Sequence, residues 1–401
     1  MHLTTKVHIA FRHLFSRPYQ TFSVVSIVAF SVGLAVALFV LIEGLKLGLI
    51  RAVEPFDLIV GAKGSSYQLV LNTVFLQDVP IGNITWDDYV ELSNDVRVDF
   101  AVPLGFGDSY RGYPVIGTTA DILNISVRAS NPPWMRIKEG RWFENGAEAV
   151  LGSRVAAESG LRVGDLFRAS HGIVAMDEHD KDFHVVGTLQ TTRGPYDRAI
   201  FIPLSTLWDE HKHHEKENNL KDTEEDKEYG EVTSVLIHPL SYPDAYSLAV
   251  SFQRSTDKQL VFPAQTAIRL FSIMGRGESF LSIIIYAVGG CALLTIMLVI
   301  YWAGAARRNE SILLHVLGAP VSTLVFISWL EGTVMLLVGV FLGELLGRLG
   351  AQLAFAALGD ATAVYSAVPF TLQEFFAPLL LLTSGSICGF FAARYSRFTL
   401  D

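Results

Sequence analysis

The sequence predicts an α-helical membrane protein that has four transmembrane helices and one large α+β domain outside the membrane. Half of its 401 residues are hydrophobic and only 18% are charged, whereas about a quarter is usual in a soluble protein. Charged residues are almost absent from four long apolar stretches, and a long segment of mixed strand and helix patterns separates the first stretch from the other three. The stretches are Phe22–Ile42, Phe280–Ala306, Val321–Leu346 and Phe375–Ala393.

Each apolar stretch is long enough to cross a membrane as a helix, because a hydrocarbon core needs about 20 helical residues. We therefore predict transmembrane helices at residues 21–48, 279–306, 321–350 and 374–394. One helix precedes the external domain and three follow it, which is a 1 + 3 arrangement. A purely soluble protein is excluded.

Basic residues mark alternate ends of these helices. Cytoplasmic loops are enriched in Lys and Arg, so we predict that both termini, the segment 307–320 and the tail 395–401 are cytoplasmic. Residues 49–278 then form one external domain, and residues 351–373 form an external loop. The basic residues are Lys6, Arg12 and Arg17 before the first helix, Arg307 and Arg308 after the second, and Arg394 and Arg397 after the fourth.

The first twenty residues predict a short amphipathic helix. Leu3, Val7, Phe11 and Leu14 recur at helical spacing among polar residues, a pattern that suits a helix lying on the inner membrane surface. A cleaved signal peptide is the alternative, but the apolar stretch runs on to Ile42 and favours an uncleaved anchor.

The external domain alternates strand and helix patterns with glycine and proline turns, which is typical of an α+β domain. Asp57–Gly61 predicts a strand that ends in a glycine turn, and Trp86–Leu92 predicts a helix capped by Thr85. A β-rich insert is expected at about residues 138–205, with a helix at 153–159. The other expected elements are strands at Ala149–Leu151, Phe183–Gly187, Ala199–Ile202 and Val232–Ile237, and a helix at Ala245–Phe252 after a turn at Pro243.

Several kinds of enzymatic chemistry are missing from the sequence. No lysine follows a glycine, so the chain has no Walker A phosphate loop and is not expected to hydrolyse ATP. It also lacks the G-x-S-x-G and H-E-x-x-H motifs. No basic patch indicates nucleic acid. We therefore predict no catalytic residue and no enzyme.

The third apolar stretch carries two acids and a glycine repeat. Glu331 and Glu344 are the only acids well inside a predicted span, and no basic residue within the spans is expected to pair with them. We favour a structural, hydrogen-bonded role for Glu331, with proton coupling as the alternative. Gly339, Gly343 and Gly347 form overlapping G-x-x-x-G units, which predict close helix packing within one chain or between two copies.

Histidines gather in two loops of the external domain. Imidazoles with nearby carboxylates are ligands for first-row metals, zinc above all, and the loops could hold zinc or handle a metal as cargo. The alternative is a solvated loop, particularly at 209–231, where ten acids stand against four lysines and disorder is expected. The candidate ligands are His171, His179, His184, His211, His213 and His214.

The segment 307–320 resembles the cytoplasmic coupling segment of MacB-type (FtsX-like) ABC transporter permeases. In that family a basic pair leads to an acid, an apolar helix, a basic residue and Leu-Gly-Ala. His315 stands where Arg or Lys is usual, and Pro320 where Ser or Thr is usual. The matching residues are Arg307, Arg308, Glu310, Leu317, Gly318 and Ala319.

This resemblance extends to the 1 + 3 topology, the N-terminal helix and the stretch from Asp57 to Gly82. It implies a permease in a bacterial inner membrane, with a periplasmic domain, that couples ATP hydrolysis on a separate ATPase to movement of that domain. ATP and Mg would lie on the partner. The partners implied are the ATPase, a second permease copy in a homo- or heterodimer, membrane lipids, and a periplasmic adaptor or lipoprotein. The function is export or release of a substrate in the envelope. The alternatives are an FtsX-like regulator of a periplasmic partner and a metal-responsive sensor.

Overall fold

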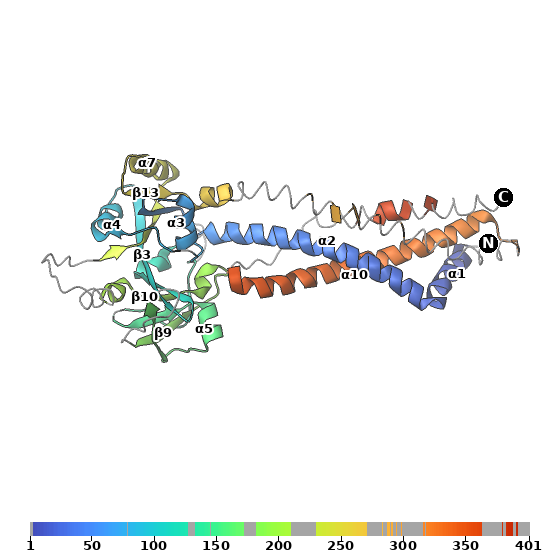
Figure 1. Cartoon of the computed structure of the whole chain (residues 1–401), viewed down its shortest axis with the longest axis horizontal. Helices are drawn as coiled ribbons and strands as arrows, with labels where there is room; N and C mark the ends of the chain where they lie inside the picture. Colours follow the sequence, from blue (N-terminus) through green and yellow to red (C-terminus); the bar gives the residue numbers. More distant parts are fainter. Residues whose placement is uncertain are drawn as a thin grey trace. The chain divides into compact units, whose positions relative to one another are not determined.

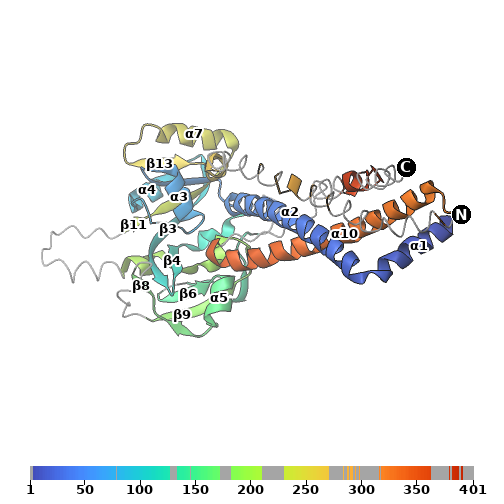
Figure 2. The same ribbon diagram turned by 45° about the vertical axis from the view of Figure 1, so that its right-hand side comes forward.

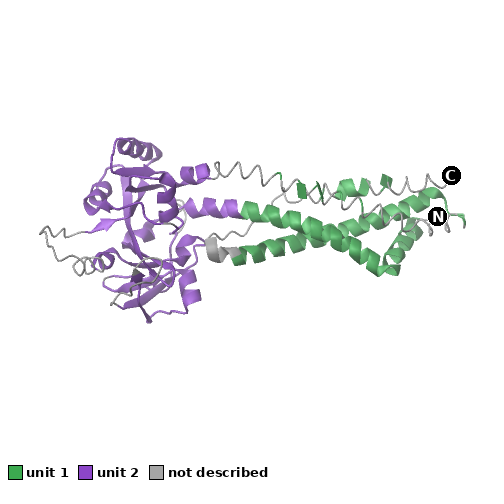
Figure 3. Ribbon diagram, in the orientation of Figure 1, with its two compact units in different colours: residues 1–44, 275–358, 367–401 green, residues 45–274, 359–366 purple. Residues whose placement is uncertain are grey.

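The computed structural model describes residues 3–77, 79–126, 133–144, 146–171, 182–209, 230–270 and 318–362, together with scattered positions from 283 to 316 and from 379 to 391. Two compact units are present (Figure 3). One comprises residues 1–44, 275–358 and 367–401, and the other comprises residues 45–274 and 359–366.

The described part of the first unit is mostly helical. Helix α1 covers Leu3–Ser16, α2 covers Pro18–Val53 and α10 covers Val321–Thr362. Two helices of the described chain, α2 and α10, are long and apolar enough to cross a membrane. Both are drawn as long ribbons in Figures 1 and 2. The second and fourth predicted spans lie mostly outside the described residues, so the four-helix count stays a prediction.

A single residue, Arg17, separates α1 from α2. Pro18 starts the new helix, and the residue before a proline disfavours the helical conformation. The junction is held by Thr21, whose hydroxyl donates to the Leu14 carbonyl at 2.9 Å and whose amide donates to the Arg17 carbonyl at 3.1 Å. The break between the helices is therefore short and tightly bonded.

The second unit is built on one mixed sheet. In its described part the strand order is β13-β1-β12-β3-β4-β10-β6-β9-β5, with β7 paired to β9 and β8 to β3, while β2 and β11 form a separate pair. The pairs β4–β10 and β6–β9 are parallel. The strands are β1 (Leu58–Ala62), β2 (Ile84–Thr85), β3 (Val98–Tyr110), β4 (Tyr113–Thr118), β5 (Ile137–Gly140), β6 (Glu148–Leu151), β7 (Leu166–Phe167), β8 (Ser170–His171), β9 (Phe183–Leu189), β10 (Ile200–Pro203), β11 (Glu231–Val232), β12 (Ser234–Pro239) and β13 (Lys258–Val261).

The sheet is apolar on both faces, so alternate residues of one strand enter different cores. Ile59 belongs to one core and Leu58 and Val60 to the other, as the period of two in a strand requires. The first core also takes the end of α2 and helix α3 (Ser66–Thr73). The second takes residues of α4 (Trp86–Ser93), α5 (Ser153–Ser159) and α7 (Tyr242–Phe252).

Three of the short helices, α3, α4 and α7, begin at polar side-chain caps. The helix predicted after Thr85 is confirmed as α4, with a capping box in which Thr85 and Asp88 bond reciprocally. Ser65 and Ser241 cap α3 and α7. The predicted helix at 153–159 is confirmed as α5, which ends at Gly160 with a left-handed φ of +76°. Two short 3-10 helices lie at Ala120–Asn124 and Pro195–Arg198.

Three local predictions need correction. Gly61 lies inside β1 rather than in a turn, and its missing side chain makes room for Leu69. The single strand expected at Val232–Ile237 is two strands, because the chain changes partners at Thr233, whose hydroxyl accepts from the Phe106 amide. Helix α7 begins at Tyr242, so that Pro243 lies in its first turn, where a proline is tolerated.

Candidate functional site

Helices α2 and α10 pack backbone against backbone along a seam of glycines. A Cβ atom on Gly339 would lie 2.7 Å from the Val28 side chain, and one on Gly347 would lie 2.5 Å from the Gly33 carbonyl oxygen. These positions admit no side chain without a shift of the helices. In lipid, where no hydrophobic drive pulls helices together, such close approach is what holds a pair.

The third glycine of the repeat, Gly343, lies in the same seam. Its Cβ position is 2.8 Å from both the Ala29 carbonyl oxygen and the Val32 side chain. Contacts advance together along both helices, from Val28 beside Gly339 to Val36 beside Gly347. The two helices therefore run in the same direction.

Helix α2 contributes to this seam with small residues of its own, which were not among the predicted packing residues. Gly33 faces Gly343, with its Cβ position 3.2 Å from the Gly343 carbonyl oxygen. Ala29, Gly33 and Ala37 repeat every four residues, which is the small-xxx-small spacing that could have identified this face. The valines around them form a buried cluster with α10: Val28, Val32, Val36 and Val40 with Leu336, Val340 and Ala351.

The two acids of α10 that lie within the predicted span, Glu331 and Glu344, both have basic neighbours. Glu331 is 1% exposed, and its Oε1 lies 3.0 Å from Nδ1 of His13 in α1. Glu344 lies 3.6 Å from Nε of Arg348, one turn later in the same helix. The expectation that no basic residue within the spans pairs with these acids was wrong for Glu344, because Arg348 lies near the end of the same predicted span. The partner of Glu331 comes from outside the predicted spans.

A further polar contact joins α10 to the described part of the fourth predicted span. The indole Nε1 of Trp329 donates to the carbonyl and hydroxyl oxygens of Ser386 at 3.1 and 3.0 Å. The Thr333 hydroxyl lies 3.2 Å from the same Ser386 hydroxyl. Side-chain hydrogen bonds of this kind fix neighbouring helices in lipid.

The coupling residues are only partly described. Arg307, Arg308, Glu310, His315 and Leu317 lie outside the described residues. Gly318 adopts a left-handed φ of +91°. It is followed by Ala319 and Pro320, and α10 begins at Val321. The predicted coupling segment thus leads directly into α10.

The histidine loops give no metal site among the residues that the structure describes. His179, His211, His213 and His214 lie outside them, and of His171 only the backbone is described, in β8 opposite Asp108 of β3. His184 is exposed on β9, opposite Leu166. No group of three potential ligands is found in the described part of the chain.

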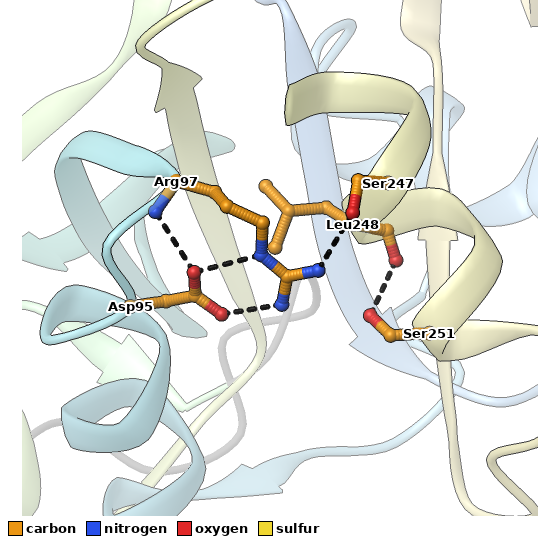
Figure 4. A network of polar contacts seen from close by, with 5 residues as sticks. All are labelled: Asp95, Arg97, Ser247, Leu248 and Ser251. Carbon is orange, nitrogen blue, oxygen red and sulfur yellow. Dashed lines mark hydrogen bonds and ion pairs between the residues drawn. The ribbon is translucent and has the colours of Figure 1, made fainter. Parts of the chain in front are cut away.

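A polar cluster just before β3 contacts α7 in the second unit (Figure 4). Arg97 donates to both carboxylate oxygens of Asp95 at 2.8 and 2.5 Å and to the Ser247 hydroxyl at 3.1 Å. Hydrogen bonds from the Arg97 guanidinium lower the pKa of Asp95. All three polar groups are used within the fold, so this cluster supports the domain and offers no chemistry.

The last turns of α2 belong to the core of the second unit. Ala52 and Val53 are 6% and 4% exposed, and both pack in the first core of the sheet with Phe56. Leu49 packs against the same core. One unbroken helix therefore carries the glycine seam and, further along, a part of the domain core.

Comparisons with known proteins identify the family. A family model described as the MacB-like periplasmic core domain matches residues 21–272, more than half of the chain. A comparison with curated protein sequences found no match. The assignment therefore rests on the family model.

Two solved structures are similar to this chain. One is the extracellular domain of the noncanonic ABC-type transporter YknZ from Gram-positive bacteria, at 11% identity and a TM-score of 0.31, covering 51% of this chain and 99% of that one. The other is the periplasmic region of MacB from Actinobacillus actinomycetemcomitans, at 12% identity and a TM-score of 0.35, covering 56% of this chain and 95% of that one.

The family model takes in most of α2 and nearly all of the domain that follows it. The family consists of membrane permeases that have a periplasmic domain and need a partner ABC ATPase. The chain belongs to the MacB/FtsX-like ABC transporter permeases.

Proposed function

We propose that this permease is a mechanical transmitter, which converts ATP hydrolysis on a separate ATPase subunit into movement of its periplasmic domain. The observation that carries the proposal is the seam between α10 and α2, together with the continuity of α2 from that seam into the domain core.

The input step takes place at the segment before α10. Its residues resemble the family's coupling segment, and its described end, Gly318 to Pro320, leads directly into the helix. A left-handed Gly318, with Pro320 two residues later, makes a short, fixed turn before α10. A displacement of the segment by the ATPase would therefore reach the first turns of α10 rather than be absorbed in a long flexible loop.

The seam then passes the displacement from α10 to α2. Val28, Val32 and Val36 lie against the glycine backbone of α10 and share one buried cluster with its Leu336 and Val340. Interiors packed this closely transmit strain because they have few voids to take it up. A sideways or tilting motion of α10 should carry α2 with it.

The output step takes place at the other end of α2. Because Ala52 and Val53 are buried in the domain core, α2 cannot shift there without moving or repacking the sheet. Burial of these side chains is favourable by about 25 cal/mol for each Å² of apolar surface, so movement of the domain as a body is the easier response. The continuous helix α2 connects the seam with the domain core.

The orientation and assembly belong to the same proposal. We place the chain in a bacterial inner membrane with both termini and segment 307–320 in the cytoplasm, as a dimer of permeases with two ATPases, serving export or release of a substrate in the envelope. The basic residues at alternate helix ends support this orientation. The parallel course of α2 and α10 also supports it, since it puts the start of α2 and the end of the coupling segment on the same side.

Zinc binding by the histidine loops is a separate proposal, supported by composition alone. Equilibrium dialysis of the purified full chain against micromolar free zinc tests it, and a stoichiometry below one ion per chain would reject it.

Gly318 offers a test of the mechanical proposal with a matched control. Gly318→Trp places a bulky side chain at a left-handed residue, whereas Gly318→Asn retains a residue that tolerates this conformation. The permease is reconstituted with its ATPase in liposomes, and spin labels on exposed Val250 report domain movement. We expect Gly318→Trp to abolish ATP-driven movement and Gly318→Asn to keep most of it. Full movement in the Trp variant would refute the assigned input.

A further inference from the structure

Helix α1 lies along the beginning of α10 and contacts it at three levels. The Lys6 ammonium lies 5.7 Å from the centre of the Phe326 ring. His13 meets Glu331 at 3.0 Å. Leu14 shares a buried cluster with Val24 and Met335. Residue numbers rise together in both helices, so α1 runs parallel to α10 over its first four turns.

Of the three contacts, the polar one between His13 and Glu331 would be the most costly to break. A carboxylate inside a membrane protein is costly and is normally held by a specific partner. Glu331 is 1% exposed and is therefore shielded from solvent, whereas the His13 side chain is 32% exposed. Moving α1 away from α10 would remove a hydrogen-bonding partner from a buried charge.

Helix α1 is fixed equally closely to α2. Only Arg17 separates the two helices, and the Thr21 hydroxyl bonds back to the Leu14 carbonyl at 2.9 Å. Val24 of α2, Leu14 of α1 and Met335 of α10 form one cluster. Three helices therefore meet at this point, about four turns into α10.

We propose that α1 is a brace that makes the beginnings of α10 and α2 move as one body, with Glu331 as a positioning residue and His13 as its partner. The inference rests on the proposed mechanical function and adds to it a second contact between input and output helices. It assigns α1 a role beyond lying on the membrane. In the rival arrangement α1 is only a lipid-facing anchor, through Phe11 and Phe15, and detaches from α10 during the cycle.

The first experiment locks α1 to α10. Leu14→Cys and Met335→Cys are combined in a chain whose natural cysteines are replaced, Cys291→Ser and Cys388→Ser, and are joined by oxidation or a short bifunctional thiol reagent. If α1 moves with α10, the locked permease, reconstituted with its ATPase, should keep at least four-fifths of its ATP-driven domain movement. Loss of movement on locking, restored by reversal of the link, would overturn the brace.

The second experiment removes the polar contact. We expect Glu331→Ala and His13→Ala each to reduce domain movement per ATP hydrolysed at least threefold, and the double variant to be no worse than either. Glu331→Gln keeps a hydrogen-bonding group and should be affected less. Covalent locking should restore movement in Glu331→Ala, which a merely misfolded variant would not show.

The outcomes separate the two proposals. If the unmodified permease shows no ATP-driven movement, the mechanical function is wrong and the brace fails with it. If the unmodified permease moves and Gly318→Trp does not, but Glu331→Ala moves normally, the mechanical function stands and the brace is wrong.

Discussion

Gly347 gives the most sensitive test of the seam between α2 and α10. In Gly347→Ala the new methyl group would lie 2.5 Å from the Gly33 carbonyl oxygen and 2.9 Å from the Val36 side chain. Comfortable contacts between such atoms are about 3.5–4.0 Å, so the helices must separate by about 1 Å. Overpacking of this kind costs about 1–3 kcal/mol. The separation would also weaken the contacts of the neighbouring turns.

The matched control lies three residues later in the same helix. Gly350 has no heavy atom within 4 Å of its Cβ position. Alanine favours a helix over glycine by about 1 kcal/mol, so Gly350→Ala should be neutral or stabilising. The two variants make the same chemical change and share the gain in helix propensity, so they should differ by the overpacking cost alone, about 1–3 kcal/mol.

Thermal unfolding of the detergent-solubilised full chain measures this difference. Gly347→Ala should unfold several degrees below the unmodified protein, and Gly350→Ala at or above it. ATP-driven domain movement should fall in the first variant alone. Equal unfolding temperatures for the two variants, or an unimpaired Gly347→Ala, would show that the close seam is not what holds these helices together.

Two predictions concern the periplasmic domain. Gly140 has φ +77° and a Cβ position 2.2 Å from the Val186 carbonyl oxygen, so Gly140→Ala should lower the free energy of unfolding by about 2–5 kcal/mol. Gly146 has φ +70° but open space around its Cβ position, so Gly146→Ala should lower it by only about 1–2 kcal/mol. Equal losses of stability in urea unfolding would contradict this. The hydrogen bond to Asp57 is the main cause that raises the pKa of His238, so its stabilisation is present below the ordinary value of about 6.5 and is lost as pH rises through the raised value. His238→Gln should lower the free energy of unfolding by less than about 1 kcal/mol in mild acid, because the His238–Asp57 pair is half exposed. In alkali the substitution should have no measurable effect on stability. A loss of stability that is independent of pH would refute this role of the ion pair.

Local rules predicted the elements whose determinants are close in sequence. Thr85 and Asp88 are three residues apart and define the start of α4 by themselves. The α5 helix ends at Gly160 for an equally local reason. The long apolar runs of α2 and α10 needed only a hydropathy average. In each case the relevant interactions lie within one or two turns of chain.

Contacts between distant residues could not be predicted in the same way. His13 and Glu331 are 318 positions apart, and nothing in either neighbourhood specifies the other. The glycine repeat of α10 predicted a packing face but not its partner, which depends on how α2 presents Gly33. The order of strands in the sheet also depends on contacts between distant residues, since β10 pairs in parallel with β4 although about eighty residues intervene.

The glycine seam leaves its own register ambiguous, and this suggests why a buried polar pair accompanies it. Val28, Val32 and Val36 repeat every four residues, as do Gly339, Gly343 and Gly347. A slip of α10 along α2 by four residues, about 6 Å, would therefore place valines on glycines again. An apolar seam resists separation, but it distinguishes poorly between two registers that repeat the same contacts.

The His13–Glu331 contact is not repeated, so it distinguishes between these registers. Because α1 is fixed to α2 at Thr21, a slipped α10 would carry Glu331 away from His13 and leave a buried carboxylate without that partner. Spin labels on exposed Phe30 and Phe341 should give one distance population in the unmodified chain and in Glu331→Gln. We expect Glu331→Ala to add a second population whose offset along the helix differs by about 6 Å. A single unchanged population in Glu331→Ala would mean that the seam fixes its register without the polar pair.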